Sequence, residues 1–246
     1  MQATEAFDGG KPMTLLEHLL ELRSRLIWCA LALVVAVIIS SIFTSRVMLF
    51  LVEPAKEQAP DFKLIVTEPM ENITVFFRVA LLGGLILAMP MFIYQTLMFV
   101  LPALTPQEKK WVFPLVVGIL ASFLIGVAFS FYVILPPSAN VLFNFNSGFA
   151  EPNIKAGSYI DFVTRLLFWV GLTFEMPIFI LALARFGMIT GRRLLGWWRF
   201  AIVGAFLLSA IITPTIDPVT QSLVAGPIIV LWLVGTGLAF LFGRPR

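Results

Sequence analysis

The stretch LIWCALALVVAVIISSIF, residues 26–43, decides the fold class of this chain. It contains no charged residue, and Arg23 and Arg25 stand shortly before it. A helix of roughly 20 apolar residues crosses the hydrocarbon core of a bilayer, which is about 30 Å thick. The run is longer than the apolar part of a typical secretory signal peptide, and no A-x-A cleavage site follows it. We therefore interpret it as a retained first membrane span.

The rest of the chain repeats this pattern. Of its 246 residues 59% are hydrophobic and 13% are charged, with a mean hydropathy of +0.97. Soluble domains carry about 25% charged residues. Five further apolar runs follow, at 73–101, 111–136, 159–187, 199–213 and 219–242. The fourth of these is short and would cross only a thinned bilayer or a protein-lined region. The sequence predicts an all-α polytopic membrane protein with six spans.

Positive charges predict the orientation of the spans, because Lys and Arg concentrate on the cytoplasmic side. Of the 17 such residues, 11 lie on one side, leaving 6 for the other. Those 11 are Lys11, Arg23, Arg25, Lys109, Lys110, Arg185, Arg192, Arg193, Arg199, Arg244 and Arg246. Both termini are then cytoplasmic. We expect a disordered tail over 1–13, one six-helix domain over 14–242, and a short tail over 243–246.

Several functional classes find no support in the composition. Cys29 is the only cysteine and His18 the only histidine, so the sequence offers no disulfide framework and no multi-histidine metal site. Hydrolase and phosphate-loop motifs are absent from the sequence. We predict no enzymatic activity, no cofactor and no metal. The small net charge of +3 does not suggest nucleic acid as a partner.

Charged residues stand close to the first span in HLLELRSRL, residues 18–26. On a helix Glu21 and Arg25 are i,i+4 neighbours, while Arg23 points elsewhere. One interpretation is a supporting ion pair with positive flanking charges. The other is that Glu21 is an acceptor for a guanidinium group, with the two arginines shaping the site.

A second carboxylate lies in FVLPALTPQEKK, residues 99–110. Thr105 and Glu108 have the spacing of a capping box, so Glu108 could simply cap the next helix. It is also the only acidic residue that the topology places on a cytoplasmic loop after Glu21. The sequence leaves both roles open.

Two further acidic residues belong to the later spans. Glu175 lies inside a predicted span, where an ionisable group is costly and usually functional, although a protonated, hydrogen-bonded structural role is the alternative. Asp217, directly before Pro218, is predicted to cap the last span, and Gln221 follows one turn later.

Taken together, these segments resemble the TatC family, the signal-receptor subunit of the twin-arginine protein translocase. The resemblance covers residues 14–242 and rests on six segments in order. They are HLLELRSRL (18–26), VEP (52–54), TEPMENITVFF with AMPMFIYQ (67–95), FVLPALTPQEKK (99–110), VGLTFEMP (170–177) and TPTIDPVTQSLVAGP (213–227).

The resemblance implies a concave bundle of six helices that binds the twin-arginine signal peptides of folded precursors and nucleates the translocation assembly. Glu21, Arg23, Arg25 and Glu108 would bind the signal. The concave pocket and the partner contacts would involve Pro54, Phe99, Glu175, Asp217 and Gln221.

The implied partners are the single-span subunits TatA and TatB, precursor proteins, membrane lipid and further copies of the chain. The implied location is the bacterial cytoplasmic (inner) membrane. The alternative is a proton-coupled secondary transporter with Glu175 as relay. It predicts a polar pathway and internal repeats, whereas Arg78 and Glu175 are the only charges well inside the predicted spans.

Overall fold

The computed structural model describes residues 15–58, 64–100, 112–144, 155–185, 187–213 and 217–243, and every structural statement concerns these residues. Their α-helices and one π-helical turn, η2, follow the predicted apolar runs. The elements are α1 Leu15–Gln58, α2 Glu71–Val100, α4 Val112–Phe129, η2 Ser130–Ile134, α5 Leu135–Asn144, α6 Ala156–Thr173, α7 Met176–Arg185, α8 Gly191–Gly196, α9 Trp198–Ile212 and α10 Pro218–Phe242.

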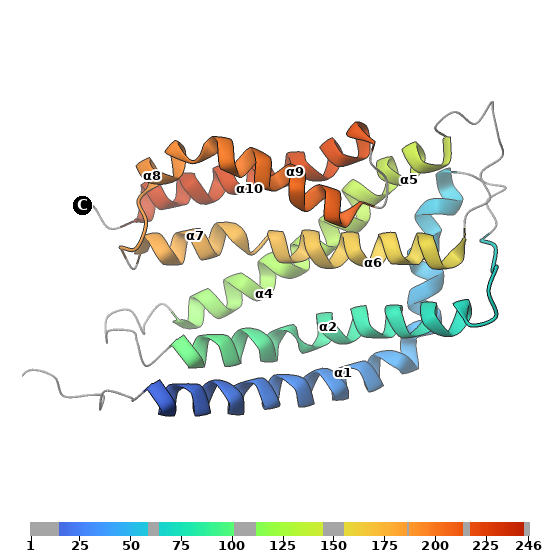
Figure 1. Cartoon of the computed structure of the whole chain (residues 1–246), viewed down its shortest axis with the longest axis horizontal. Helices are drawn as coiled ribbons and strands as arrows, with labels where there is room; N and C mark the ends of the chain where they lie inside the picture. Colours follow the sequence, from blue (N-terminus) through green and yellow to red (C-terminus); the bar gives the residue numbers. More distant parts are fainter. Residues whose placement is uncertain are drawn as a thin grey trace, which may run out of the picture.

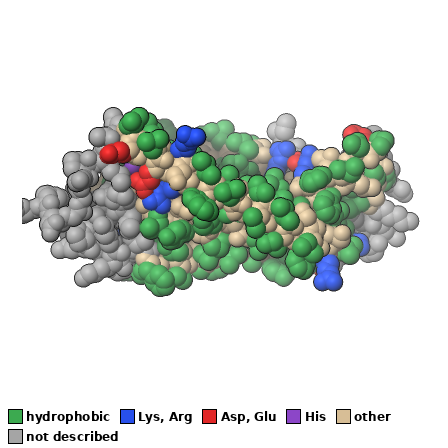
Figure 2. All heavy atoms as spheres, turned by 90° about the horizontal axis from the view of Figure 1, so that it is seen from below, with side chains coloured by type: hydrophobic (Ala, Val, Ile, Leu, Met, Phe, Trp, Pro, Cys, Tyr) green, Lys and Arg blue, Asp and Glu red, His purple; other side chains and the backbone are tan. Residues whose placement is uncertain are grey.

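Within these residues, five helical segments are long and apolar enough to cross a membrane, and α9 is a shorter apolar helix. The predicted all-α membrane fold with six apolar helices is thereby confirmed, including a short fifth helix of 15 residues. Figure 2 shows the charged side chains of one face lying toward the two ends of the bundle, with mostly hydrophobic surface between them. This pattern is typical of a protein with a lipid-facing belt.

The helices run side by side along the long axis of the molecule (Figure 1). The beginning of α1, the end of α2, the beginning of α4, α8 and the end of α10 share one end, which we call the N-terminal end of the bundle. The end of α1, the beginning of α2, α5 and the beginning of α6 lie at the opposite end. The pair α9–α10 stops short of that opposite end (Figure 1).

The first helix is longer than the predicted span at both ends. The amphipathic segment before residue 26 continues into the span without a break, as expected. The C-terminal part of α1 turns out of the direction of the other long helices and crosses the view of α2 and α6 toward α5 (Figure 1). Ser41 Oγ donates to the Val37 carbonyl at 2.8 Å, and Thr44 Oγ1 to the Ser40 carbonyl at 3.0 Å. Such bonds to the preceding turn often bend helices.

A buried tyrosine anchors this turned part of α1. Tyr159 of α6 is 1% exposed, and its hydroxyl donates to the Leu51 carbonyl at 2.9 Å. The two residues belong to one hydrophobic core that α1, α2, α5, α6 and α10 share. The segment between the first two predicted runs, residues 44–72, is therefore helical as far as Gln58, because packing against α6 supports it.

Two close helix contacts depend on glycine. A Cβ on Gly84 of α2 would lie 2.4 Å from Val37 Cγ2 of α1. A Cβ on Gly126 of α4 would lie 2.9 Å from the Cα of Gly171 in α6. Small residues let helix backbones approach closely in membranes, where apolar surface alone gives no preference for protein over lipid. The first of these contacts brings α1 and α2 close together, and the candidate site depends on that pair.

Candidate functional site

Polar side chains join the beginning of α1 to the C-terminal part of α2. Arg25 Nε donates to Glu21 Oε1 at 2.9 Å, and Arg25 Nη2 donates to the same oxygen. Arg25 Nη1 donates to Gln95 Oε1 of α2 at 3.2 Å. The predicted Glu21–Arg25 pair is confirmed. One guanidinium group thus links the two helices, since it contacts a carboxylate on one and an amide on the other.

Glu21 uses only one of its two carboxylate oxygens in these contacts. Its Oε2 is buried and has no hydrogen-bond partner among the described residues. The Glu21 side chain as a whole is 19% exposed and that of Arg25 20%. A buried oxygen without a donor raises the free energy of the folded state. A ligand that supplies N–H donors and positive charge would satisfy it.

Two other predicted site residues, Phe99 and Arg23, belong to this end of the bundle. The Phe99 ring stacks on the His18 ring, with centroids 4.2 Å apart and planes inclined by 19°. Arg23 is exposed and forms no ion pair within the described ranges. Glu108, the second predicted carboxylate, lies outside the described residues, as does its predicted capping partner Thr105.

Glu175 lies where α6 meets α7, inside a candidate membrane span as predicted. Pro177 has no N–H for the Thr173 carbonyl, so the helix is interrupted there. Ser122 Oγ of α4 donates to the adjacent Phe174 carbonyl at 2.5 Å. The Glu175 residue is 3% exposed, and its Oε1 has no hydrogen-bond partner in the described part of the chain.

The remaining predicted residues lie away from Glu21. Pro54 is buried in the last turns of α1. Asp217 Oδ2 accepts a hydrogen bond from the Thr220 N–H at 2.6 Å, which confirms the predicted cap of α10. The Gln221 carbonyl accepts from Ser209 Oγ of α9 at 2.7 Å, which ties the last two helices together. The five predicted pocket residues therefore come from four separate places in the fold.

Comparison with known proteins identifies this arrangement of helices. The model of the family described as Sec-independent protein translocase protein (TatC) matches residues 17–227. The chain belongs to the TatC family. This assignment makes it a component of a protein translocase, and it removes the transporter alternative from further consideration.

Named relatives are similar in sequence to this chain over nearly its whole length. Sec-independent protein translocase protein TatC of Synechocystis sp. is 34% identical, over 94% of this chain and 90% of the relative. TatC of Aquifex aeolicus is also 34% identical, over 95% of this chain and 98% of the relative. The chloroplastic TATC of Arabidopsis thaliana is 35% identical, over 98% of this chain and 70% of the relative.

A solved structure supports the same conclusion about the fold. The crystal structure of a protein described as the twin-arginine translocase receptor TatC superposes with a TM-score of 0.84. It is 34% identical in sequence, and the match covers 93% of this chain and 100% of that one. At this level of likeness the TatC chain described here shares its helix arrangement.

One polar network of this TatC chain was not predicted from its sequence. Glu71 Oε1 accepts from the Gly157 N–H at 2.7 Å, which joins the beginnings of α2 and α6. Asp161 binds Arg78 at 3.0 Å and Arg165 at 2.9 Å. The expectation that Arg78 and Glu175 are the only charges well inside spans was wrong, because Asp161 and Arg165 are the sixth and tenth residues of the candidate span that begins at Ala156. The sequence did contain a signal for part of this network, because Asp161 and Arg165 have the four-residue spacing of an ion pair on a helix.

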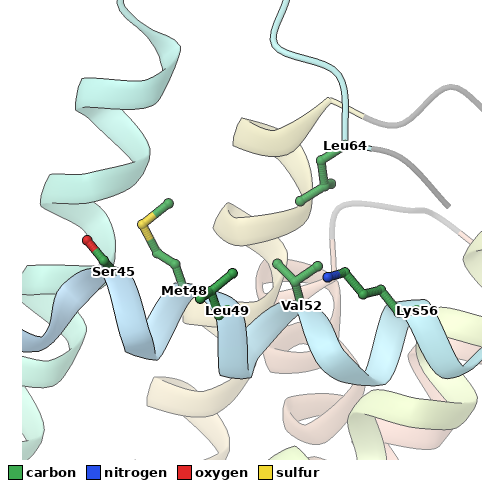
Figure 3. Close-up of a pocket in the computed structure, with 6 residues that line it drawn as sticks. All are labelled: Ser45, Met48, Leu49, Val52, Lys56 and Leu64. Atoms are coloured by element: carbon green, nitrogen blue, oxygen red, sulfur yellow. The ribbon is translucent and has the colours of Figure 1, made fainter.

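A pocket of about 460 Å³ lies beside the C-terminal part of α1. Figure 3 shows side chains from one side of α1 and Leu64 from the following segment around it. It is lined by Ser45, Met48, Leu49, Val52, Lys56 and Leu64. None of the predicted site residues lines it. No group of three or more His, Cys, Asp or Glu side chains that could hold a metal ion is found among the described residues.

Proposed function

We propose that this chain is the receptor subunit that binds the twin-arginine signal peptides of folded precursor proteins at the N-terminal end of the bundle. Membership of the TatC family supports this role. So does the likeness to a solved structure described as the twin-arginine translocase receptor. The single observation that carries the site is the buried Oε2 of Glu21, which lacks a donor among the described residues.

Glu21 is suited to a guanidinium rather than to an ammonium group. A guanidinium offers several N–H donors in a planar fork, whereas an ammonium acts as a compact and strongly hydrated point charge. Oε2 is buried, so a ligand must shed water to reach it, and the weaker hydration of the guanidinium favours arginine. This preference explains how a receptor could distinguish Arg-Arg from Lys-Lys.

Arg25 already occupies the other oxygen of the receptor carboxylate. An incoming arginine must therefore bind Oε2 beside Arg25 or displace Arg25 toward Gln95. Either route brings two guanidinium groups close together, which opposes binding. Arg25 consequently acts as a competitor within the chain, and it keeps Glu21 paired while no signal peptide is bound.

The second arginine of the signal needs a second carboxylate. Glu108 is the acidic residue proposed for this role, as the resemblance implies. Arg23, exposed on another side of α1, contributes to the cationic surroundings that orient the signal peptide. Phe99, stacked on His18, offers an aromatic surface to the apolar part of the signal.

The other predicted residues are assigned to later steps. Glu175 in the membrane interior, together with Pro54, Asp217 and Gln221, contacts the apolar part of the signal or the partner subunits TatA and TatB. The chain works as a homo-oligomer within that complex. Its location is the bacterial cytoplasmic membrane, with both termini in the cytoplasm and the N-terminal end of the bundle facing the cytoplasm.

Binding of a labelled signal peptide to the detergent-purified full chain tests the proposal. We expect tighter binding of an Arg-Arg peptide than of its Lys-Lys variant. We also expect Glu21→Gln and Glu108→Gln each to weaken binding about tenfold to a hundredfold, because each removes one charge-assisted pair. Glutamine keeps the capping geometry at position 108. Equal affinity for both peptides would refute the receptor function, and unchanged affinity in both folded variants would refute the site.

A further inference from the structure

The part of the chain after Glu175 is rich in arginine and almost free of acidic residues. After Glu175 the sequence contains a single carboxylate side chain, Asp217. Asp217 caps the beginning of α10, far along the chain from α8. Three exposed arginines cluster in α8 and the first turn of α9: Arg192, Arg193 and Arg199. No ion pair among the described residues neutralises them.

Two tryptophans lie beside these arginines. The guanidinium carbon of Arg193 is 5.3 Å from the Trp197 ring centroid, and that of Arg199 is 5.4 Å from the Trp198 ring. Both distances are within the roughly 6 Å of a cation–π contact. The two tryptophan residues are nevertheless 47% and 49% exposed. Each arginine is thus held against an indole that remains accessible at the surface.

The position of this cluster along the helices places it at the edge of the hydrocarbon layer. Helix α9 has 15 residues and spans about 22 Å, less than the hydrocarbon thickness of about 30 Å. Gly191, at the beginning of α8, packs against Phe240 near the end of α10, so α8 fills the missing length. Trp197, Trp198 and Arg199 therefore lie closer to the middle of the membrane than the end of α10 does. This level is the membrane–water interface, where tryptophan is enriched in membrane proteins.

An arginine at this depth needs an anion. The neighbouring Arg185 has a protein partner, because its Nη1 donates to the Phe242 carbonyl at 3.0 Å. Arg193 and Arg199 have cation–π contacts but no carboxylate among the described residues. Lipid phosphate is the anion present at the level of interfacial tryptophans, and the guanidinium fork matches it.

We propose that Arg193 and Arg199, with Trp197 and Trp198, form a binding site for the phosphate group of an anionic phospholipid in the leaflet at the N-terminal end of the bundle. The guanidinium groups bind the phosphate, and the exposed indoles lie against the glycerol and upper acyl region. Leu195 and Phe200, 47% and 76% exposed, extend the apolar surface for the acyl chains. The ligand is the lipid and not free phosphate, because the acyl chains supply contacts that inorganic phosphate lacks.

Native mass spectrometry of the purified full chain with added phospholipid tests this site. The wild type should retain phosphatidylglycerol in preference to phosphatidylcholine. Arg193→Gln/Arg199→Gln should lower this preference about thirtyfold, as expected for two cations at an anionic surface. The lysine double variant should retain part of the preference, because charge remains while the fork is lost. Arg46→Gln, a single exposed arginine outside the cluster, should match the wild type.

Four results would overturn the proposal. One is equal retention of the two lipids by the wild type, and another is an unchanged preference in a folded glutamine double variant. Inorganic phosphate that displaces the lipid at millimolar concentration would show that the site takes the anion without the acyl chains. Loss of signal-peptide binding with unchanged lipid preference would identify the cluster as a protein-docking surface instead. Thermal unfolding of each variant verifies that it is folded.

Discussion

Removing the charge of Arg25 should strengthen the binding of a twin-arginine signal peptide. In the unliganded chain Arg25 donates twice to Glu21 Oε1, and Oε2 has no described partner. The substitution Arg25→Gln leaves a shorter, uncharged side chain that no longer neutralises Glu21. Both carboxylate oxygens then become available, and the repulsion between two guanidinium groups disappears.

The size of the effect follows from the proximity of the two cations. A guanidinium on Oε2 would lie about 6 Å from that of Arg25, where like charges repel by about 0.7 kcal/mol in water and 2.8 kcal/mol at an effective dielectric constant of 20. The side chains of Arg25 and Glu21 are 20% and 19% exposed, which favours an intermediate value. A repulsion of about 1–2 kcal/mol corresponds to a fivefold to thirtyfold gain in affinity.

Fluorescence anisotropy of a labelled Arg-Arg peptide measures this change in detergent. Glu21→Gln should bind about tenfold more weakly than the wild type. The double variant Arg25→Gln/Glu21→Gln should match Glu21→Gln within about twofold, because without the carboxylate the peptide arginine is no longer held beside position 25 and the repulsion has no effect. Arg46→Gln is the control for lost positive charge. Weaker binding by folded Arg25→Gln, or additive effects in the double variant, would refute the competition.

Other features of the fold give further predictions. Tyr159→Phe should lower the free energy of unfolding by about 1 kcal/mol, because a buried hydrogen bond to α1 is lost; an unchanged denaturant midpoint would contradict this. Gly84→Ile should separate α1 from α2 and abolish the folded yield in detergent, whereas a wild-type yield would show that the close contact is dispensable. In a background without Cys29, a cysteine label at Gln107 should react only from the cytoplasm and one at Asp61 only from outside. The reverse pattern would overturn the topology.

The helices were predictable because each apolar run exceeds or approaches the length of a span. The extension of α1 to Gln58 could not be predicted, since polar residues such as Glu53 and Lys56 are typical of a loop. Contacts of Leu51 and Ala55 with the shared core keep this part helical. Tertiary packing, which no local pattern reveals, decided the boundary.

The candidate site divides in the same way between local and distant contacts. The pair Glu21–Arg25 follows from helical spacing, and the cap by Asp217 follows from the proline after it. Gln95 could not be assigned, because it lies 70 residues from Arg25 in the chain. The only feature of the sequence that pointed to Gln95 was its position as an amide side chain within a long apolar run. The role of Glu108 stays a prediction.

The distribution of charge at the N-terminal end of the bundle explains how Glu21 can direct a cationic signal. Arginines dominate this end, so most of its surface repels a peptide that carries two arginines. Phospholipid phosphates on Arg193 and Arg199 would neutralise the largest cluster without providing a protein acceptor. Arg25 neutralises Glu21 by an exchangeable contact, since a second guanidinium can take its place. A ligand with the same chemistry as Arg25 is therefore the kind of group that this end of the bundle can accept.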